Sequence, residues 1–261
     1  MRPSSNAPDR WLAYREVNPR AKMRVFCFPY AGGGASIYRG WGASLPGDVE
    51  VCPVQIPGRE SRLREPGFAE PGPMIQAIAD ALDPSMNLPF VFFGHSMGAM
   101  IAFELARELR RRGRPQPLHL FVSGRRAPQL PTREEPIHAL PDAEFIEKLR
   151  ELNGTPEEVL QHEELMKLIT PILRADFSVN ETYEYTEEPP LDAGISAFGG
   201  LGDAEVTRED LEAWKESTRG RFRLRMLPGD HFFINSHRDL ILESVARDLA
   251  EVSAAPAPRA W

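Results

Sequence analysis

Short runs of mainly apolar residues recur along the chain and alternate with segments of helical periodicity. The runs predict β-strands, because an uninterrupted apolar segment of this length suits a strand buried on both faces. The predicted strands are residues 11–17, 23–28, 49–54, 90–93, 118–123, part of 191–198, and 222–227. The helices expected between them are residues 37–45, 74–82, 99–112, 207–214 and 237–252. This alternation predicts an α/β fold with a mostly parallel central sheet that helices flank on both faces.

The alternation stops between about residues 125 and 190, where no convincing strand pattern occurs. Helical patterns cover residues 142–152, 156–159 and 163–179 instead, and Pro171 is expected to kink or split the last of them. Such an insertion, lying between the two halves of a sheet, suits a lid over an active site. The alternative is a set of helices that only cover the core.

A length of 261 residues suits one large domain, here expected to span residues 1–261 with flexible termini at about 1–9 and 254–261. The formal charge of −7 argues against a nucleic-acid partner, because phosphate binding needs a basic surface. One basic run, residues 107–114, falls at the end of a predicted helix. It is either a solvated helix end, where cations favour the helix dipole, or a patch for an acidic partner.

Cys27 and Cys52 both fall in predicted buried strands and lack the spacing of a metal site or a disulfide framework. The N-terminus has no basic segment followed by an apolar one, and no apolar run approaches the ~18 residues of a membrane span. We therefore expect a cytoplasmic, soluble protein that does not contact a membrane.

The most informative stretch is Gly94-His95-Ser96-Met97-Gly98, which lies between the strand at 90–93 and the helix at 99–112. A serine on a sharp strand-to-helix turn is typical of the nucleophile elbow of hydrolases. Glycines two positions before and after it allow a turn too tight for side chains. The helix start behind Ser96 directs free N–H groups at any negative charge that develops on a substrate.

A glycine-rich loop, residues 29–36, follows the strand at 23–28 and has two interpretations. It could hold a phosphate, but it lacks both the dinucleotide-binding and the P-loop patterns. It could instead supply one donor of an oxyanion hole, whose other donor is the N–H after the serine, at Met97. Ala31 is the preferred donor in this loop, and Tyr30 or Gly32 could replace it.

A nucleophilic serine needs a base and an acid that orients the base, in the chain order serine, acid, histidine. His231 is the best candidate for the base, because it lies in a turn after the last predicted strand. The other histidines lie beside the serine, in a strand, in the helical insertion or at a helix start: His95, His119, His138, His162 and His237.

Asp203 is the best candidate for the acid, because it follows a predicted strand and a glycine-rich turn. Asp230 adjoins His231 too closely to reach the far side of its ring, and Asp192 precedes its strand. The three residues Ser96, Asp203 and His231 would hydrolyse an acyl compound through an acyl-enzyme. This chemistry needs no metal or other cofactor, and no cluster of ligands suggests one.

The chain resembles the type II thioesterases, stand-alone α/β-hydrolases that accompany polyketide synthases and nonribosomal peptide synthetases. The resemblance covers roughly residues 23–252. It rests on five blocks, which are residues 28–33, 55–59, 94–98, 199–203 and 228–233. By matching position it implies that Ser96, Asp203 and His231 form the triad and that Ala31 and Met97 form the oxyanion hole. One departure is Ala204, where the family more often has proline.

The resemblance also implies the substrate: an acyl group on the phosphopantetheine arm of an acyl or peptidyl carrier protein, removed to edit or regenerate the synthase. Residues 125–190 would be the lid over the acyl chamber, and the chain would act as a monomer. The arginines that could meet an acidic carrier, or could simply be solvated, are Arg59, Arg62, Arg64, Arg125 and Arg126. The alternatives are a chain-terminating fatty acyl thioesterase, a general carboxylesterase, and a binding protein with an idle triad.

Overall fold

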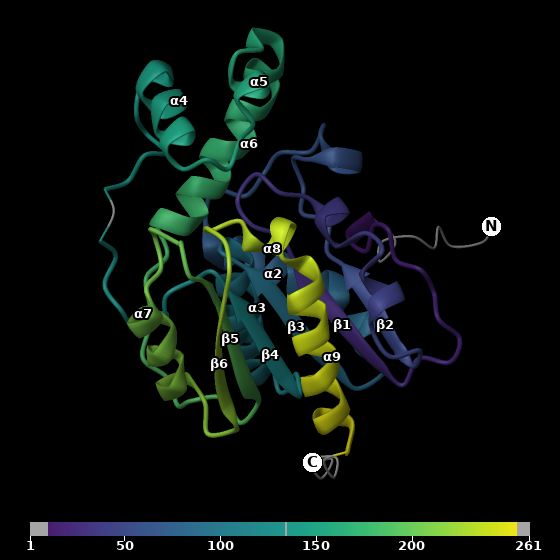
Figure 1. The fold of residues 1–261 in the computed structure, drawn as a ribbon. Coiled ribbons are helices and arrows are strands. Elements are labelled where there is room, and N and C mark those ends of the chain that lie inside the picture. The colour runs from purple at the N-terminus through teal and green to yellow at the C-terminus, as the bar shows by residue number, and fades with distance from the viewer. Residues whose placement is uncertain (1–9, 134, 255–261) are drawn as a thin grey trace, which may run out of the picture.

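A six-stranded parallel β-sheet forms the centre of the computed structural model, which describes residues 10–133 and 135–254 (Figure 1). The spatial order is β2-β1-β3-β4-β5-β6. The strands are β1 (Met23–Phe28), β2 (Val49–Pro53), β3 (Phe90–His95), β4 (His119–Ser123), β5 (Gly194–Gly200) and β6 (Phe222–Leu227). The chain places β2 on one side of β1 and then β3 to β6 in order on the other side, as in doubly wound sheets. The predicted α/β architecture is confirmed.

Helices cover both faces of the sheet and enclose two separate apolar cores. One face carries α2 (Pro71–Leu82), α3 (Met97–Arg111) and α7 (Arg208–Glu212); the other carries α8 (Phe233–Ser236) and α9 (Arg238–Ala254). Strand β3 shows why both form: Phe90 and Phe92 pack into the first core, whereas Val91 and Phe93 pack into the second. Alternate side chains of a strand point to opposite faces, so a strand that is apolar throughout needs cover on both.

The insertion forms three helices, α4 (Asp142–Glu151), α5 (Glu157–Leu160) and α6 (Glu163–Glu181). They stand above the carboxyl ends of the strands, at the top of Figure 1. Their own small core contains Phe145, Leu149 and Met166. Helix α6 runs unbroken through Pro171, so of the two outcomes expected of this proline, a kink or a split, the split is wrong.

Two further sequence-based predictions are wrong near the N-terminus. Residues 11–17 form no strand, and only Leu12 makes an isolated antiparallel bridge, to Val54. The helix expected over 37–45 is instead two 3-10 helices, η1 (Ala35–Tyr38) and η2 (Trp41–Ser44), which are separated at Gly40 with φ 76°. A left-handed residue ends a helical turn, and glycine adopts it without strain.

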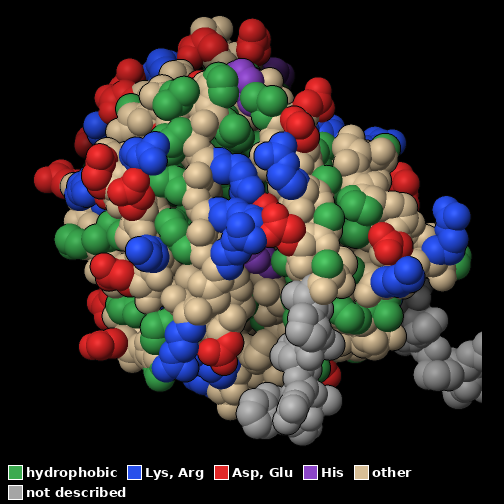
Figure 2. All heavy atoms as spheres, turned by 60° about the horizontal axis from the view of Figure 1, so that its bottom comes forward, with side chains coloured by type: hydrophobic (Ala, Val, Ile, Leu, Met, Phe, Trp, Pro, Cys, Tyr) green, Lys and Arg blue, Asp and Glu red, His purple; other side chains and the backbone are tan. Residues whose placement is uncertain are grey.

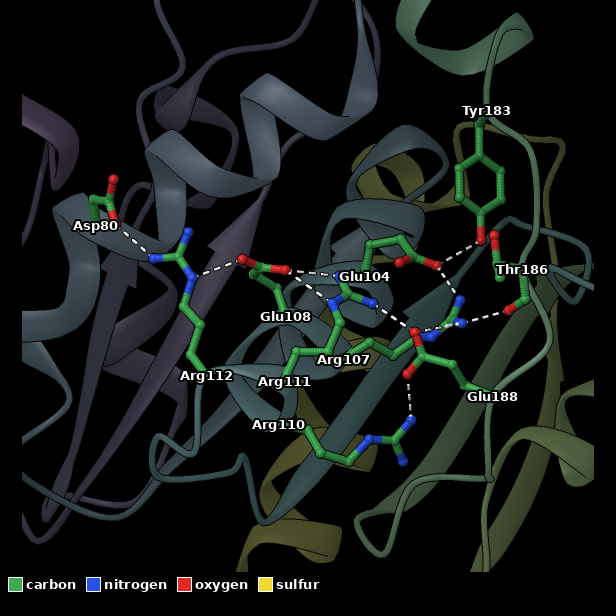
Figure 3. A network of polar contacts seen from close by, with 10 residues as sticks. All are labelled: Asp80, Glu104, Arg107, Glu108, Arg110, Arg111, Arg112, Tyr183, Thr186 and Glu188. Carbon is green, nitrogen blue, oxygen red and sulfur yellow. Dashed lines mark hydrogen bonds and ion pairs between the residues drawn. The ribbon is translucent and has the colours of Figure 1, made fainter.

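The arginines of the basic run at the end of α3 form ion pairs with other parts of the same chain (Figure 3). Arg107, Arg110 and Arg111 all pair with Glu188, in the segment that leads from the insertion back to the sheet. Arg112 pairs with Asp80 on α2. These contacts favour neither a freely solvated helix end nor a binding patch: the arginines hold neighbouring elements together.

The face seen when the bottom of Figure 1 is turned forward shows basic and acidic side chains next to one another, interspersed with hydrophobic ones (Figure 2). Within the described ranges, no helix is long and apolar enough to cross a membrane. Cys27 and Cys52 are buried free thiols, as expected. Residues 1–9 and 255–261, where flexible termini are expected, lie outside the described residues, and Ala254 ends α9.

Candidate active site

Ser96 occupies the sharp turn between β3 and α3, with φ 52° and ψ −117°. A Cβ at Gly94 would lie 2.0 Å from the carbonyl oxygen of Gly98, and one at Gly98 would lie 2.0 Å from that of Phe28. The two glycines are therefore a steric requirement of this turn. Positive φ in a serine is strained backbone, which proteins retain mainly where function requires it.

The side chains of His231 and Asp203 are hydrogen-bonded, with 2.9 Å between Nδ1 and Oδ2. Asp203 lies in the loop after β5, and His231 in the turn between β6 and α8. The other oxygen of Asp203 accepts the N–H groups of Glu205 and Val206, at 2.9 and 3.2 Å. These bonds fix the carboxylate, and the carboxylate in turn directs Nε2 of His231 away from itself.

Glu205 is a residue of this site that the sequence did not single out. Its Oε2 lies 3.9 Å from Nε2 of His231. Burial lowers the pKa of His231, but its hydrogen bond to Asp203 and the charges of Glu205 and Asp203 outweigh this effect, so the pKa is raised above its ordinary value. The sequence indicates a role for Glu205 only through its position, two residues after Asp203 in the same loop.

The glycine-rich loop after β1 lies beside this site. The N–H of Gly32 is bound to Oδ2 of Asp176 at 2.7 Å, so it is not available to a substrate. The N–H of Gly33 is bound to the carbonyl of Tyr30 at 2.9 Å. Met97 is the first residue of α3, where backbone N–H groups have no partner within the helix.

His95 faces into the protein, as its place beside the serine suggested. Its Nδ1 lies 2.9 Å from the hydroxyl of Ser123. Burial, and secondarily the charge of His231, holds the pKa of His95 well below its usual range, so the ring is neutral. It packs against His231 with 5.3 Å between ring centroids. His95 thus supports the position of the His231 ring by packing against it.

One cavity of about 1100 Å³ joins these groups. Ser96, His231, Ala31 and Glu205 all line it. The insertion contributes most of its apolar wall, through Leu149, Leu152, Val159, Ile169, Ile172, Leu173 and Phe177. The cavity is large enough for an acyl chain of substantial length beside the serine.

The histidines set aside in the sequence have other partners. His119 bonds to Ser196 at 2.9 Å, and burial lowers its pKa to about 4. His138 pairs with Glu181 of α6 at 2.5 Å, and His162 caps the start of that helix. No group of three or more histidine, cysteine, aspartate or glutamate side chains within the described residues could hold a metal ion.

The sheet, the nucleophile elbow and the loop positions of the polar residues define an α/β-hydrolase. The model of the family described as "Thioesterase domain" matches residues 23–250, and the chain belongs to this family. It is therefore an enzyme, a serine hydrolase that acts on thioesters, and the resemblance to type II thioesterases is confirmed.

Three similar proteins place it more closely. The gramicidin S biosynthesis protein GrsT of Aneurinibacillus migulanus is 47% identical over 246 residues, covering 94% of this chain and 96% of GrsT. RedJ, a thioesterase of the prodiginine pathway in Streptomyces coelicolor, is 43% identical, with TM-score 0.80 over 87% of this chain and 85% of RedJ. BorB, the type II thioesterase of the borrelidin cluster, is 34% identical, with TM-score 0.81 over 93% and 96%.

Proposed function

We propose that this enzyme hydrolyses acyl thioesters carried on the phosphopantetheine arm of acyl or peptidyl carrier proteins. Its nucleophile is Ser96, its base is His231 and its orienting acid is Asp203. The observation that carries the assignment is the Asp203–His231 hydrogen bond, whose imidazole lines the same cavity as a serine on a strained elbow. The biosynthetic pathways named for GrsT, RedJ and BorB support the carrier as the source of the thioester.

The reaction starts when Nε2 of His231 removes the proton from the hydroxyl of Ser96, whose oxygen attacks the thioester carbonyl. The N–H groups of Met97 and Ala31 hold the oxyanion; removing one such donor typically costs about 10²–10³ in rate. The carbon–sulfur bond then breaks, and the thiol leaves with the proton from His231. Water, deprotonated by the same imidazole, then attacks the acyl carbonyl of the acyl-enzyme. The bond to Oγ of Ser96 breaks, the imidazolium returns its proton to that oxygen, and the acid is released.

The insertion, residues 125–190, is proposed as the lid of a single-domain enzyme, since its helices form much of the cavity wall. Two of the arginines considered for carrier docking are engaged elsewhere: Arg59 pairs with Asp176, and Arg62 with Glu65. Arg64 is exposed and stays a candidate for that contact. We further propose a cytoplasmic monomer that needs no cofactor.

Competing substrates separate this function from its alternatives. We expect kcat/KM to be highest on acyl groups loaded on a holo-carrier protein, lower on the same acyl group on coenzyme A, and lowest on p-nitrophenyl esters. Ser96→Ala should abolish all three activities. Rates on free esters equal to those on the carrier would contradict the proposal and favour a general carboxylesterase. Unchanged handling of acyl-carrier by Ser96→Ala would favour a binding protein.

A further inference from the structure

Helix α6 of the insertion is joined to the glycine-rich loop by one buried carboxylate. Asp176 is 1% exposed. Its Oδ2 accepts the N–H of Gly32 at 2.7 Å and a bond from Nη1 of Arg59 at 2.6 Å, and its Oδ1 accepts a bond from Nη2 of Arg59 at 2.7 Å. One side chain of the lid therefore contacts the backbone of the loop directly.

Arg59 extends the contact to the other side of the same loop. It is 4% exposed, and besides Asp176 it donates to the carbonyl of Gly33 at 3.1 Å. Leu173, one turn before Asp176 on α6, adds a steric contact: a Cβ at Gly32 would lie 2.5 Å from its Cδ2. Bidentate charged hydrogen bonds fix geometry as well as distance, so loop and helix are held in one relative position.

The held atoms determine where the N–H of Ala31 points. That N–H shares a planar peptide with the carbonyl of Tyr30, and in a trans peptide the two groups point in opposite directions. The carbonyl of Tyr30 accepts the N–H of Gly33, so it faces into the turn, and the N–H of Ala31 faces outward. Asp176 binds the N–H of Gly32, which lies between Ala31 and Gly33, and thereby stabilises the shape of the turn.

We propose that Asp176 is a positioning residue for the oxyanion hole, and that it makes the hole depend on the seating of lid helix α6. When α6 is seated, the N–H of Ala31 is aimed at the cavity. When α6 moves away, Asp176 leaves the N–H of Gly32, and the turn is free to rotate that donor out of place. The inference rests on the proposed function, because it assigns a role within that same site.

A purely structural role predicts different behaviour, and two ligands distinguish the roles. A trifluoromethyl ketone analogue of an acyl-pantetheine adds to Ser96 and places a negative oxygen in the oxyanion hole. A non-hydrolysable thioether analogue binds in the same cavity without that charge. Loss of oxyanion positioning weakens only the ketone, whereas loss of the cavity wall weakens both.

The test uses Asp176→Ala, together with the double variant Asp176→Ala/Arg59→Met, which avoids leaving a buried arginine unpaired and carries the test if the single variant does not fold. For each we expect kcat/KM to fall between about 10-fold and the 10²–10³-fold of a deleted donor. Affinity for the ketone should fall by the same factor, and affinity for the thioether should stay within about twofold.

The control is Ser178→Ala, which removes another bond from α6 to the body of the protein, to the carbonyl of Ala69 at 2.8 Å. It should change none of these quantities. An unchanged kcat/KM in the Asp176 variants, or equal losses for both ligands, would overturn the inference. Failure of the proposed function has a separate sign: wild-type enzyme that leaves acyl-carrier intact but still distinguishes the two ligands.

Discussion

At the scale of single residues, the site depends on groups whose neighbours fix their charge. His231 acts as a base only when it is neutral, and its pKa is raised because the Asp203 bond and nearby carboxylates outweigh burial. Activity is therefore present above that pKa and is lost as the pH falls through it. Glu205 raises this pKa through its negative charge, since its Oε2 lies 3.9 Å from Nε2 of His231.

Glu205→Gln removes that charge and keeps the size of the side chain. The pKa of His231 should fall, so the acidic limb of the pH profile of kcat/KM should move to lower pH. Glu209→Gln, at an exposed residue of α7, is the control and should leave the limb in place. A limb that stays where it is, or moves to higher pH, in Glu205→Gln would show that this carboxylate does not act on His231.

Gly98 is limited by sterics, since its missing Cβ would lie 2.0 Å from the carbonyl oxygen of Phe28. Gly98→Ala should lower the free energy of unfolding by about 1–3 kcal/mol or more, as measured by urea titration. The control is Gly72→Ala in α2, where a Cβ meets nothing within 4 Å. That change should be neutral or stabilise by up to about 1 kcal/mol. Equal effects of the two substitutions would contradict the steric account.

At the scale of elements, α6 carries both the cavity wall and Asp176, and it contains Pro171 in mid-helix. A proline in a helix interior costs about 3 kcal/mol relative to alanine. Up to about 1 kcal/mol of this cost is offset, because proline also restricts the conformations of the unfolded chain. The helix is retained because its apolar face packs into the core of the insertion.

Pro171→Ala should therefore raise the free energy of unfolding by about 2 kcal/mol. Slower amide exchange along α6 should accompany the gain, because the helix recovers a hydrogen bond. Both are measured on the intact chain, by denaturant titration and by exchange followed with mass spectrometry. Faster exchange in α6, or a less stable protein, would show that the proline is needed for the packing of this helix.

Some of these elements could be predicted from the sequence, and others could not. The six strands were predictable because mainly apolar runs of this length have few other solutions. The capping box of α7 pairs Thr207 with Asp210, three residues later, which is a spacing typical of helix starts. The split at Gly40 and the continuity of α6 at Pro171 were not predictable, since tertiary packing decides both. Asp176 and Gly32 are 144 positions apart, and no local pattern relates them.

At the scale of the whole molecule, the insertion is tied back to the body at its far end through Glu188 (Figure 3). Burial raises the pKa of Glu188, but bonds from Arg110, Arg111 and Arg107 outweigh it and lower the pKa to about 2. A carboxyl group with a lowered pKa in the folded state stabilises the fold above its unfolded pKa of about 4.3. That contribution is lost as the pH falls from there towards 2.

Glu188→Gln should lower the free energy of unfolding by about 1–2 kcal/mol at pH 7, once solvent screening of these partly exposed groups is allowed for. The difference from wild type should shrink as the pH falls below about 4. Glu243→Gln, in an exposed pair with Arg247, should change stability by less than about 0.5 kcal/mol. A Glu188→Gln deficit that is independent of pH would contradict an ionic role.

The central claim is that Ser96 removes acyl groups from a carrier protein's arm, and one measurement tests it most directly. An acyl-loaded carrier is mixed with wild-type enzyme or with Ser96→Ala, and the intact masses of both proteins are followed over time. We predict that the wild type returns the carrier to its free-thiol mass through an acyl adduct on Ser96, and that Ser96→Ala leaves the carrier loaded. A carrier that stays loaded with wild-type enzyme, or is unloaded equally fast by Ser96→Ala, would contradict the account.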